Sequence, residues 1–246
     1  MKKYLLIFQM LIITVLSYSL NFTVYPTRFL VPIDRITTQE LKVINNTEEP
    51  LRVEIFTEAD EEFGKEYNLN SNIKIFPNII SIKPGESQIV RFRVKPNEKL
   101  NDGEYKSYLT FKEVPYEVKN NEVEKNKKIS SNLKFNTEIS IPISSLNEVS
   151  SNVMGKVENI IYNYNGTDLN IKCTTISKGN TALQIFYILT VDGLPTIKGK
   201  IGYSKREGKK DLNVGILLPV EVKGKKANLK VFDQTGKEYY NENISF

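Results

Sequence analysis

The stretch "NLKFNTEISIPI", residues 132–143, alternates apolar and polar side chains over its whole length. A period of two is typical of a β-strand with one dry face and one wet face. At roughly 3.3 Å per residue, such a strand would extend about 40 Å, whereas an ordinary strand has about five or six residues. The dry face carries Leu133, Phe135, Ile139, Ile141 and Ile143, with the small Thr137 in the gap. So long an apolar face must pack against another apolar surface.

The segments before this strand also have a period of two, and no amphipathic helix of useful length interrupts them. Turn residues separate the segments at "NNTEEP", "KPGES" and "NDGE". Short strands with regular Pro and Gly punctuation predict an all-β sandwich. The segments are "NFTVYPTRFLV", "TQELKVINN", "PLRVEIFTE", "NIKIFP", "IISI", "SQIVRFRVKP" and "EYKSYLTFKEVP".

A polar stretch, "SSLNEVSSN" at 144–152, has no apolar pattern and is predicted to be a linker. Beyond it the period of two starts again and gives seven strand candidates, from "KVENIIYNYN" to "KEYYNENISF". The sequence therefore predicts two β-sandwich domains in series, at residues 21–145 and 151–246.

The composition is that of a folded protein without a nucleic-acid surface. The chain has 246 residues, 40% of them hydrophobic, which suffices for proper cores. The net charge of +5 results from 34 basic and 29 acidic residues that are spread along the chain. A nucleic-acid surface would need a basic patch with interleaved aromatic residues, and the sequence shows none. We expect no nucleic-acid partner.

Residues 1–20, "MKKYLLIFQMLIITVLSYSL", have the layout of a secretory signal peptide: a basic start, an apolar run and small residues at the end. Ser17 and Ser19 occupy positions −3 and −1 of a cleavage point before Leu20 or Asn21. An uncleaved membrane anchor is the alternative, because the apolar run nearly reaches the ~20 residues of a spanning helix. The sequence favours cleavage and export.

The chemistry of common catalytic sites is missing. The sequence has no histidine, which excludes Cys–His and Ser–His–Asp catalysis as well as zinc sites built on histidine and cysteine. A single cysteine, Cys173, cannot form an internal disulfide and is predicted to be a small buried residue. Asp60, Glu61 and Glu62 are interpreted as a charged surface cluster. We therefore expect no enzyme activity, no cofactor, no metal and no small-molecule substrate.

Four motifs in the first half, in this order, resemble the periplasmic pilus chaperones of the chaperone–usher pathway, the PapD type. They are "YPTR" (25–28), "LKVINNTEEPLRVEIF" (41–56), "IFPNIISIKPGESQIVRFRV" (75–94) and "LNDGEYKSYLTFKEVP" (100–115). The third motif matches the family in the spacing of Pro77, Pro84, Gly85, Gln88 and Arg91. The second half resembles the family more loosely, mainly through strand count and "SKGNTAL".

This resemblance implies two immunoglobulin-like β-sandwich domains, a periplasmic location, and two protein partners: fimbrial or pilus subunits and an outer-membrane usher. In this family the subunit lacks its last strand, and the chaperone lends a strand of its own to fill the open groove. A charged loop, "EVKNNEVEKNKK", leads into the long alternating strand, which would be the donor.

On the family's spacing, the side chains of Leu133, Phe135 and Thr137 fill the subunit's pockets, with Ile129 and Ile139 at the ends. The alternative is that the apolar side chains of 129–143 pack inside their own sandwich. We prefer this alternative for Ile141 and Ile143, which lie near the domain junction.

Arg28 resembles the family's anchor for the C-terminal carboxylate of the subunit, in the cleft between the domains. Guanidinium geometry suits a carboxylate clamp. The alternative is an exposed arginine at a strand end. Two departures suggest a divergent branch: Ser140 stands where an ungapped match places the family's second anchoring lysine, and Gly103 replaces an arginine between Asp102 and Glu104.

The competing interpretation is an exported two-domain structural or adhesive surface protein with the same immunoglobulin-like sandwiches. A pilus subunit would carry an N-terminal donor extension ahead of a single incomplete domain. Two complete-looking domains instead follow the signal directly, and this favours the chaperone.

Overall fold

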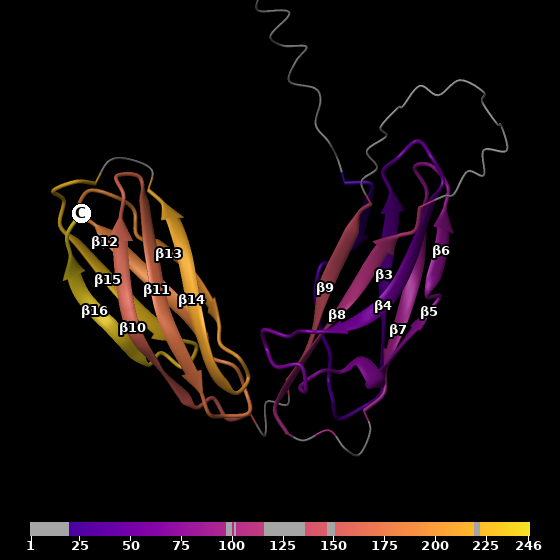
Figure 1. Cartoon of the computed structure of the whole chain (residues 1–246), viewed down its shortest axis with the longest axis horizontal. Coiled ribbons are helices and arrows are strands. Elements are labelled where there is room, and N and C mark those ends of the chain that lie inside the picture. Colours follow the sequence, from indigo (N-terminus) through magenta and orange to yellow (C-terminus); the bar gives the residue numbers. More distant parts are fainter. Residues whose placement is uncertain (1–19, 97–99, 101, 116–135, 147–150, 219–221) are drawn as a thin grey trace, which may run out of the picture.

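The computed structural model describes residues 20–96, 100, 102–115, 136–146, 151–218 and 222–246 (Figure 1). Residues 1–19 of the predicted signal peptide and the charged loop before the long strand lie outside these residues. Within the described part, regular structure consists of β-strands and one short 3-10 helix, η1 (Asn70–Asn72). No described segment forms a helix of the length and apolarity that a bilayer span requires.

The first sandwich is formed by two sheets, with strand orders β1-β3-β7-β5 and β2-β9-β8-β4-β6. Every strand pair in it is antiparallel except β2 with β9, which is parallel. Its strands are β1 (Phe22–Tyr25), β2 (Phe29–Leu30), β3 (Thr37–Asn45), β4 (Leu51–Ala59), β5 (Ile73–Phe76), β6 (Ile79–Ile82), β7 (Ser87–Val94), β8 (Glu104–Glu113) and β9 (Glu138–Leu146).

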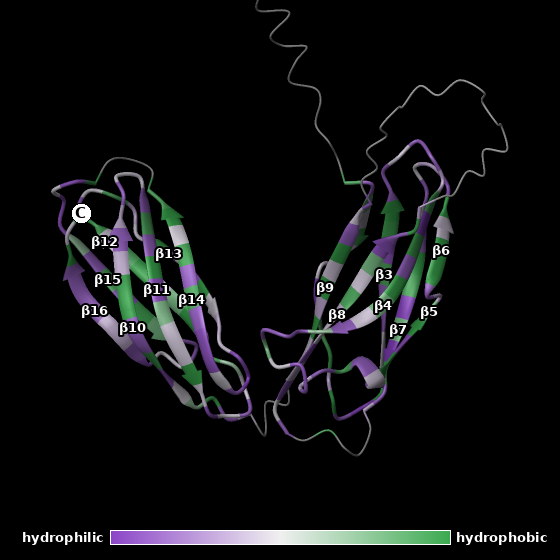
Figure 2. Ribbon diagram, viewed as in Figure 1, coloured by the Kyte–Doolittle hydropathy of each residue, from purple (hydrophilic) through white to green (hydrophobic). Residues whose placement is uncertain are grey.

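The core of the first sandwich lies between these two sheets, and Figure 2 shows hydrophobic residues recurring along the strands. Val43, Phe92 and Phe111 are at most 1% exposed. Each large side chain buried in this way stabilises the fold by about 1.5–3 kcal/mol. Ile141 and Ile143 belong to the same core, at 2% and 0% exposure. This confirms that they pack inside their own sandwich.

Strand β9 differs from the sequence prediction at both ends. It begins at Glu138 rather than at residue 132, and Asn136 and Thr137 precede it without strand conformation. The cause lies in its neighbour: β8 ends at Glu113, and Pro115, which has no N–H to donate, follows soon after. The backbone N–H of Thr137 donates instead to the Glu113 carboxylate at 3.0 Å.

The predicted linker starts too early. Ser144, Ser145 and Leu146 continue β9 and pair with Lys106, Tyr105 and Glu104 of β8. Ladder hydrogen bonds to β8 hold this polar end in the sheet, and a search for apolar alternation does not detect such a strand. The predicted bounds of the two domains stay a prediction.

The second sandwich contains the seven strands that the sequence predicted. Its sheets have the orders β10-β11-β14 and β13-β12-β15-β16. Cys173 is 3% exposed in its core, where burial raises the pKa of the thiol to about 11, so it is a structural residue, as predicted. The strands are β10 (Gly155–Tyr164), β11 (Asp168–Ser177), β12 (Gln184–Val191), β13 (Ile197–Tyr203), β14 (Gly208–Leu217), β15 (Ala227–Asp233) and β16 (Glu238–Ile244).

The two sandwiches meet at one end and diverge from there (Figure 1), and Arg206 of the second is buried at the junction. Its guanidinium donates to the carbonyl oxygens of Asp102 at 2.8 Å and Glu104 at 2.9 Å in the first sandwich. The same guanidinium lies 4.1 Å and 4.7 Å from the ring centroids of Tyr67 and Tyr105. This arginine therefore joins the two domains.

Gly103 explains one departure from the family pattern. Its φ is +115°, and a Cβ at this position would lie 2.3 Å from the carbonyl oxygen of Asn180 in the second sandwich. The next residue, Glu104, donates its backbone N–H to that same oxygen at 2.8 Å. A side chain in place of Gly103 would separate the two backbones, so glycine is required here.

Candidate functional site

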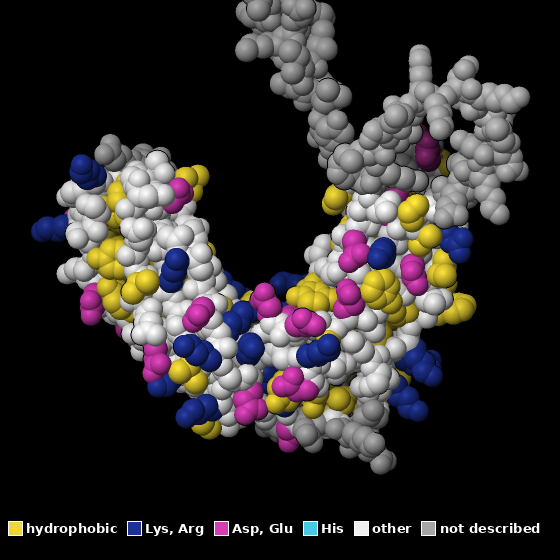
Figure 3. All heavy atoms as spheres, in the orientation of Figure 1, with side chains coloured by type: hydrophobic (Ala, Val, Ile, Leu, Met, Phe, Trp, Pro, Cys, Tyr) yellow, Lys and Arg dark blue, Asp and Glu magenta, His cyan; other side chains and the backbone are white. Residues whose placement is uncertain are grey.

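A cleft of about 630 Å³ lies between the sandwiches, next to the junction. Figure 3 shows the molecule hollowed between its two halves, with basic and acidic side chains gathered where they meet. The cleft is lined by Arg28, Phe29, Leu30, Phe63, Glu104, Lys106, Tyr108, Pro142 and Ser144 of the first sandwich, and by Gln184 and Tyr203 of the second.

Arg28 stands in this cleft because of the strand that follows it. Phe29 of β2 is 8% exposed, and its ring packs edge-on against Phe92 at a centroid distance of 4.8 Å. Phe29 of β2 pairs with Ile143 of β9, and this pairing fixes the position of the segment that carries Arg28. Arg28 itself is exposed and forms no ion pair with any carboxylate in the described part of the chain.

A second cation, Lys106 of β8, also lines the cleft. Its ammonium lies 2.5 Å from the carboxylate of Asp60, which also accepts hydrogen bonds from the Tyr108 hydroxyl at 3.1 Å and the Phe63 N–H at 3.0 Å. The interpretation of Asp60 as a surface residue was wrong: it is 6% exposed. A sequence does not show that residue 60 has a partner on another strand.

The Asp60–Lys106 pair shifts the pKa of both groups. Burial alone would raise the pKa of Asp60, but the hydrogen bond and charge of Lys106, together with the hydrogen bonds from Phe63 and Tyr108, lower that pKa. Burial alone would lower the pKa of Lys106, but Asp60 and Tyr108 together raise that pKa. Both groups are therefore charged at neutral pH.

Glu104 belongs to the cleft and to the junction at once. Its carboxylate accepts a hydrogen bond from the backbone N–H of Ala182 in the second sandwich at 3.0 Å. Burial raises the pKa of this carboxyl, and the Ala182 hydrogen bond and the charges of Lys106 and Arg206 offset only part of the effect. Glu104 thus both lines the cleft and helps to join the two domains.

The predicted donor residues fall into two groups. Thr137 and Ile139 are half-buried at the start of β9, and Ile139 packs partly against the first core. Ile129, Leu133 and Phe135 lie outside the residues that the structure describes. The structure therefore brings Arg28 and the β9 strand into one region but leaves the outer donor positions as predictions.

The cation expected at residue 140 has a counterpart on the neighbouring strand. The Ser140 hydroxyl lies 3.0 Å from that of Thr110, and Ser140 is not among the cleft residues. Two other β9 residues, Pro142 and Ser144, line the cleft, and the direct neighbour of Ser144 on β8 is Lys106. Sequence reasoning missed Lys106 because it searched one strand only, and a lysine on the adjacent strand reaches the same space.

The free edge of β9 completes the site. On the side away from β8, the described neighbour of β9 is β2, which pairs only with Ile143 and Ser144. The backbone of 138–142 therefore has no strand partner on that side among the described residues. An unpaired edge of this kind is a template for another strand.

Fold and site define a two-sandwich protein with an open strand edge that runs into a cationic cleft. A family model described as "Pili and flagellar-assembly chaperone, PapD N-terminal domain" matches residues 21–143, which is half of the chain. The chain belongs to this family of assembly chaperones. No curated protein sequence matches it significantly.

Solved structures of low sequence identity are similar over nearly the whole chain. The YadV chaperone has 11% identity, covers 92% of this chain and 100% of its own, and gives a TM-score of 0.48. The E. coli chaperone DraB has 14% identity, coverage of 92% and 98%, and a TM-score of 0.48. The Salmonella enterica SafA pilin in complex with the SafB chaperone has 13% identity, coverage of 94% and 98%, and a TM-score of 0.46.

Proposed function

We propose that the protein is a periplasmic chaperone that captures pilus subunits by donor-strand complementation and delivers them to an outer-membrane usher. The observation that carries this proposal is the free edge of β9 (residues 138–142), which ends at β2 beside Arg28. Added strands bind to such edges through main-chain hydrogen bonds, and alternate side chains fill pockets for specificity.

The geometry also sets the direction of the added strand. β2 runs parallel to β9 and occupies the last part of the edge. A strand that continues the line of β2 and runs parallel to β9 therefore ends, with its carboxyl group, at Arg28. A strand in the opposite direction would bring its N-terminal ammonium to Arg28, and two like charges repel. Arg28 thus selects a strand with a free C-terminus, such as the last strand of a subunit.

Two cations are available to the incoming carboxylate. Arg28 offers a planar guanidinium that forms no ion pair with the residues that the structure describes, and its shape suits bidentate binding. Lys106 is bound to Asp60 but keeps further N–H donors, and its side chain remains 22% exposed in the same cleft. Lys106 takes the role of the second anchoring cation in this proposal.

In this proposal, the donor residues that enter the subunit's groove are Ile129, Leu133, Phe135, Thr137 and Ile139. Three or four inserted apolar side chains at roughly 1.5–3 kcal/mol each give about 5–10 kcal/mol of gross burial. The subunit gains a missing strand, and its exposed groove no longer promotes aggregation. This chemistry requires no nucleotide, metal or other cofactor.

Arg28→Ala tests the clamp. Removal of one partner of a buried charge pair costs about 2–5 kcal/mol of binding, so we expect the variant to lose subunit capture in co-expression while its melting temperature stays that of the wild type. Arg35→Ala, at another exposed arginine close in sequence, is the matched control and should capture normally. Undiminished co-purification of subunit with Arg28→Ala would refute the clamp.

Phe135→Glu tests strand donation separately. If Phe135 is a donor residue, the free chaperone tolerates the charge, whereas the subunit's groove would receive an unpaired carboxylate, which is strongly unfavourable. We expect near-wild-type melting together with lost capture. Ile141→Glu is the contrasting control: Ile141 is 2% exposed, so this change should unfold the protein by itself. A large fall in melting temperature for Phe135→Glu would assign Phe135 to the protein's own core instead.

A further inference from the structure

The outer face of the sheet β13-β12-β15-β16 carries an apolar centre. A solvated sheet face normally presents polar residues, but here Phe186 and Ile188 of β12 and Phe232 of β15 stand on the side opposite the core. The rings of Phe186 and Phe232 stack with their centroids 5.8 Å apart and an interplanar angle of 27°. The three side chains are only half-buried, so this face is a surface and not a second core.

Lysines surround this centre. The ammonium of Lys200 lies 5.3 Å from the ring centroid of Phe186, and that of Lys230 lies 5.8 Å from the centroid of Phe232. Such contacts hold a cation over an aromatic face. Lys230 is neutralised by an ion pair with Glu238. Lys198 and Lys200 on β13 have no carboxylate partner in the described part of the chain, so the positive charge is concentrated along β13.

This positive strip is continuous with the cleft. Lys200 donates a hydrogen bond to Gln184 at 3.4 Å, and its ammonium lies 4.1 Å from the ring centroid of Tyr203. Gln184 and Tyr203 are the two residues through which the second sandwich lines the cleft that holds Arg28. The cationic surface therefore passes from one sandwich to the other.

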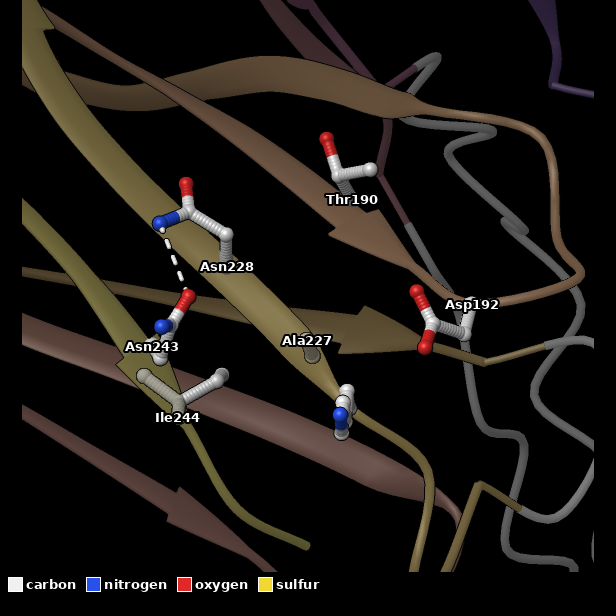
Figure 4. Close-up of a pocket in the computed structure, with 7 residues that line it drawn as sticks. Thr190, Asp192, Ala227, Asn228, Asn243 and Ile244 are labelled. Carbon is white, nitrogen blue, oxygen red and sulfur yellow. Dashed lines mark hydrogen bonds between the residues drawn. The ribbon is translucent and has the colours of Figure 1, made fainter.

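The far end of the same face has a different character. Figure 4 shows a shallow pocket where Thr190, Asn228 and Asn243 lie side by side on β12, β15 and β16. These side chains are uncharged, and the amide of Asn228 donates to that of Asn243 at 3.5 Å. Asp192 and Lys226, which have opposite charges, line the same pocket. This end of the face thus carries charges of both signs, whereas Lys198 and Lys200, at the end that adjoins the cleft, have no carboxylate partner in the described residues.

We propose that Lys198 and Lys200, supported by Phe186, form a second contact surface for the captured subunit and receive an acidic patch of that subunit near its anchored C-terminus. The inference rests on the proposed function. Complementary charge at the rim of an interface steers the encounter and suppresses partners of the wrong charge. A sugar ring is a poorer fit, because the protein's own ammonium already occupies the aromatic face that would stack on it.

The test compares two charge-reversed double variants. Lys198→Glu with Lys200→Glu removes the strip. Lys172→Glu with Lys223→Glu is the matched control, because both lysines are exposed in the same domain and form no described ion pair. Each pair changes two charges from +1 to −1, so the net charge falls by four in both variants, from +5 to +1.

The probe is a pilus subunit that the wild-type chain keeps soluble in co-expression, and the measured quantity is its association rate over a salt series. We expect roughly a tenfold slower association for the strip variant at low salt, with the difference fading at high salt, and a change of less than about twofold for the control. Equal slowing of both variants would overturn the proposal, because net charge alone would then explain it.

A second probe separates this inference from the proposed function. If Arg28→Ala captures subunit as well as the wild type does, the proposed clamp fails, and a deca-glutamate peptide then tests the strip alone. The expected result is a set of salt-sensitive NMR shifts of amides in β12 and β13 that disappear in the strip variant. Absence of those shifts, or shifts spread over all lysine-rich surfaces, would overturn the proposal.

Discussion

Lys106 and Arg206 are two largely buried cations near the same domain junction, yet they are satisfied in opposite ways. Lys106 binds a carboxylate, that of Asp60, and its side chain stays 22% exposed in the cleft. Arg206 is 5% exposed and forms no ion pair among the described residues; it contacts the carbonyls of Asp102 and Glu104 and two tyrosine rings.

The difference shows how one junction can both fix the angle between the two domains and leave the cleft able to bind a ligand. Two carbonyl oxygens from neighbouring residues define the place of a planar guanidinium, so Arg206 fixes geometry. An ammonium has three rotatable donors, so Lys106 can keep Asp60 and still bind a ligand. The fixed hydrogen bonds of Arg206 suit the junction between the domains. The ammonium of Lys106, which can bind Asp60 and a ligand together, suits the cleft.

The largest effect is expected for Arg206→Met. The change leaves two junction carbonyls without their donor, and each unsatisfied buried group costs about 1–3 kcal/mol. We expect a loss of about 3–5 kcal/mol in the free energy of unfolding, measured by denaturant titration. Lys209→Met, at an exposed position nearby, should cost under about 0.5 kcal/mol. Equal stability of the two variants would show that Arg206 does not hold the domains together.

A smaller effect is expected for Asp60→Asn, which leaves the Lys106 ammonium without its counter-charge. Removal of one partner of a buried pair costs about 3–5 kcal/mol, and partial exposure of Lys106 reduces this to about 2–3 kcal/mol. The double variant Asp60→Asn with Lys106→Met should be more stable than the sum of the two single changes predicts. If the stability losses of the two single variants simply added up in the double variant, Asp60 and Lys106 would not stabilise each other.

The pH dependence of stability separates the two cations. The pKa of Asp60 is lowered on folding, so its contribution is present above its ordinary pKa of 3.8 and is lost as the pH falls through the lowered value. The pKa of Lys106 is raised, so its contribution is present below 10.5 and is lost as the pH rises through the raised value.

We therefore expect the contribution of the Asp60–Lys106 pair itself to be constant from about pH 5 to 9. A smaller change above pH 4.5 should come from Glu104, because the charge of Lys106 lowers the pKa of that carboxyl. The cost of Arg206→Met should depend on pH only through Glu104 and Tyr67, whose pKa values the charge of Arg206 lowers, because carbonyl groups do not titrate. Melting temperatures over a pH series would check both statements. A steep change near neutral pH would contradict the pKa directions.

The smallest effect concerns Glu104→Gln. Folding raises the pKa of Glu104, so protonation favours the folded state: this contribution is fully present below the ordinary pKa of 4.5 and is lost as the pH rises through the raised value. Glutamine keeps an acceptor for the Ala182 N–H but carries no charge. We expect a slightly higher melting temperature than the wild type at pH 7 and convergence of the two curves near pH 4. A lower melting temperature at pH 7 would contradict the burial effect.

The alternation of side chains was sufficient to predict the architecture. The dry faces of the strands and the buried Ile141, Ile143 and Cys173 follow from local pattern and from the area that each face must bury. The end of β9 does not follow, because Ser144 to Leu146 stay in the sheet through main-chain bonds to β8. Main-chain hydrogen bonds of this kind do not depend on side-chain polarity, so a polarity pattern cannot predict them.

The site was predictable only in part, for a related reason. Arg28 could be found because its motif is local. Lys106 and Arg206 could not, since the meaning of each depends on a partner far away in sequence, Asp60 for the first and the 102–104 backbone for the second. The sequence showed that Gly103 departs from the family pattern, but only the position of Asn180 explains why a glycine is required there.

The contact between Gly103 and Asn180 also bears on how the protein unfolds. At this point the main chains of the two sandwiches touch directly, with a hydrogen bond from Glu104 to Asn180 and no layer of side chains between them. If either sandwich opened alone, the hydrogen bond from Glu104 to Asn180 and those from Arg206 to the carbonyls of Asp102 and Glu104 would break. We therefore expect the two sandwiches to melt as a single calorimetric unit, with one transition whose enthalpy is that of the whole chain.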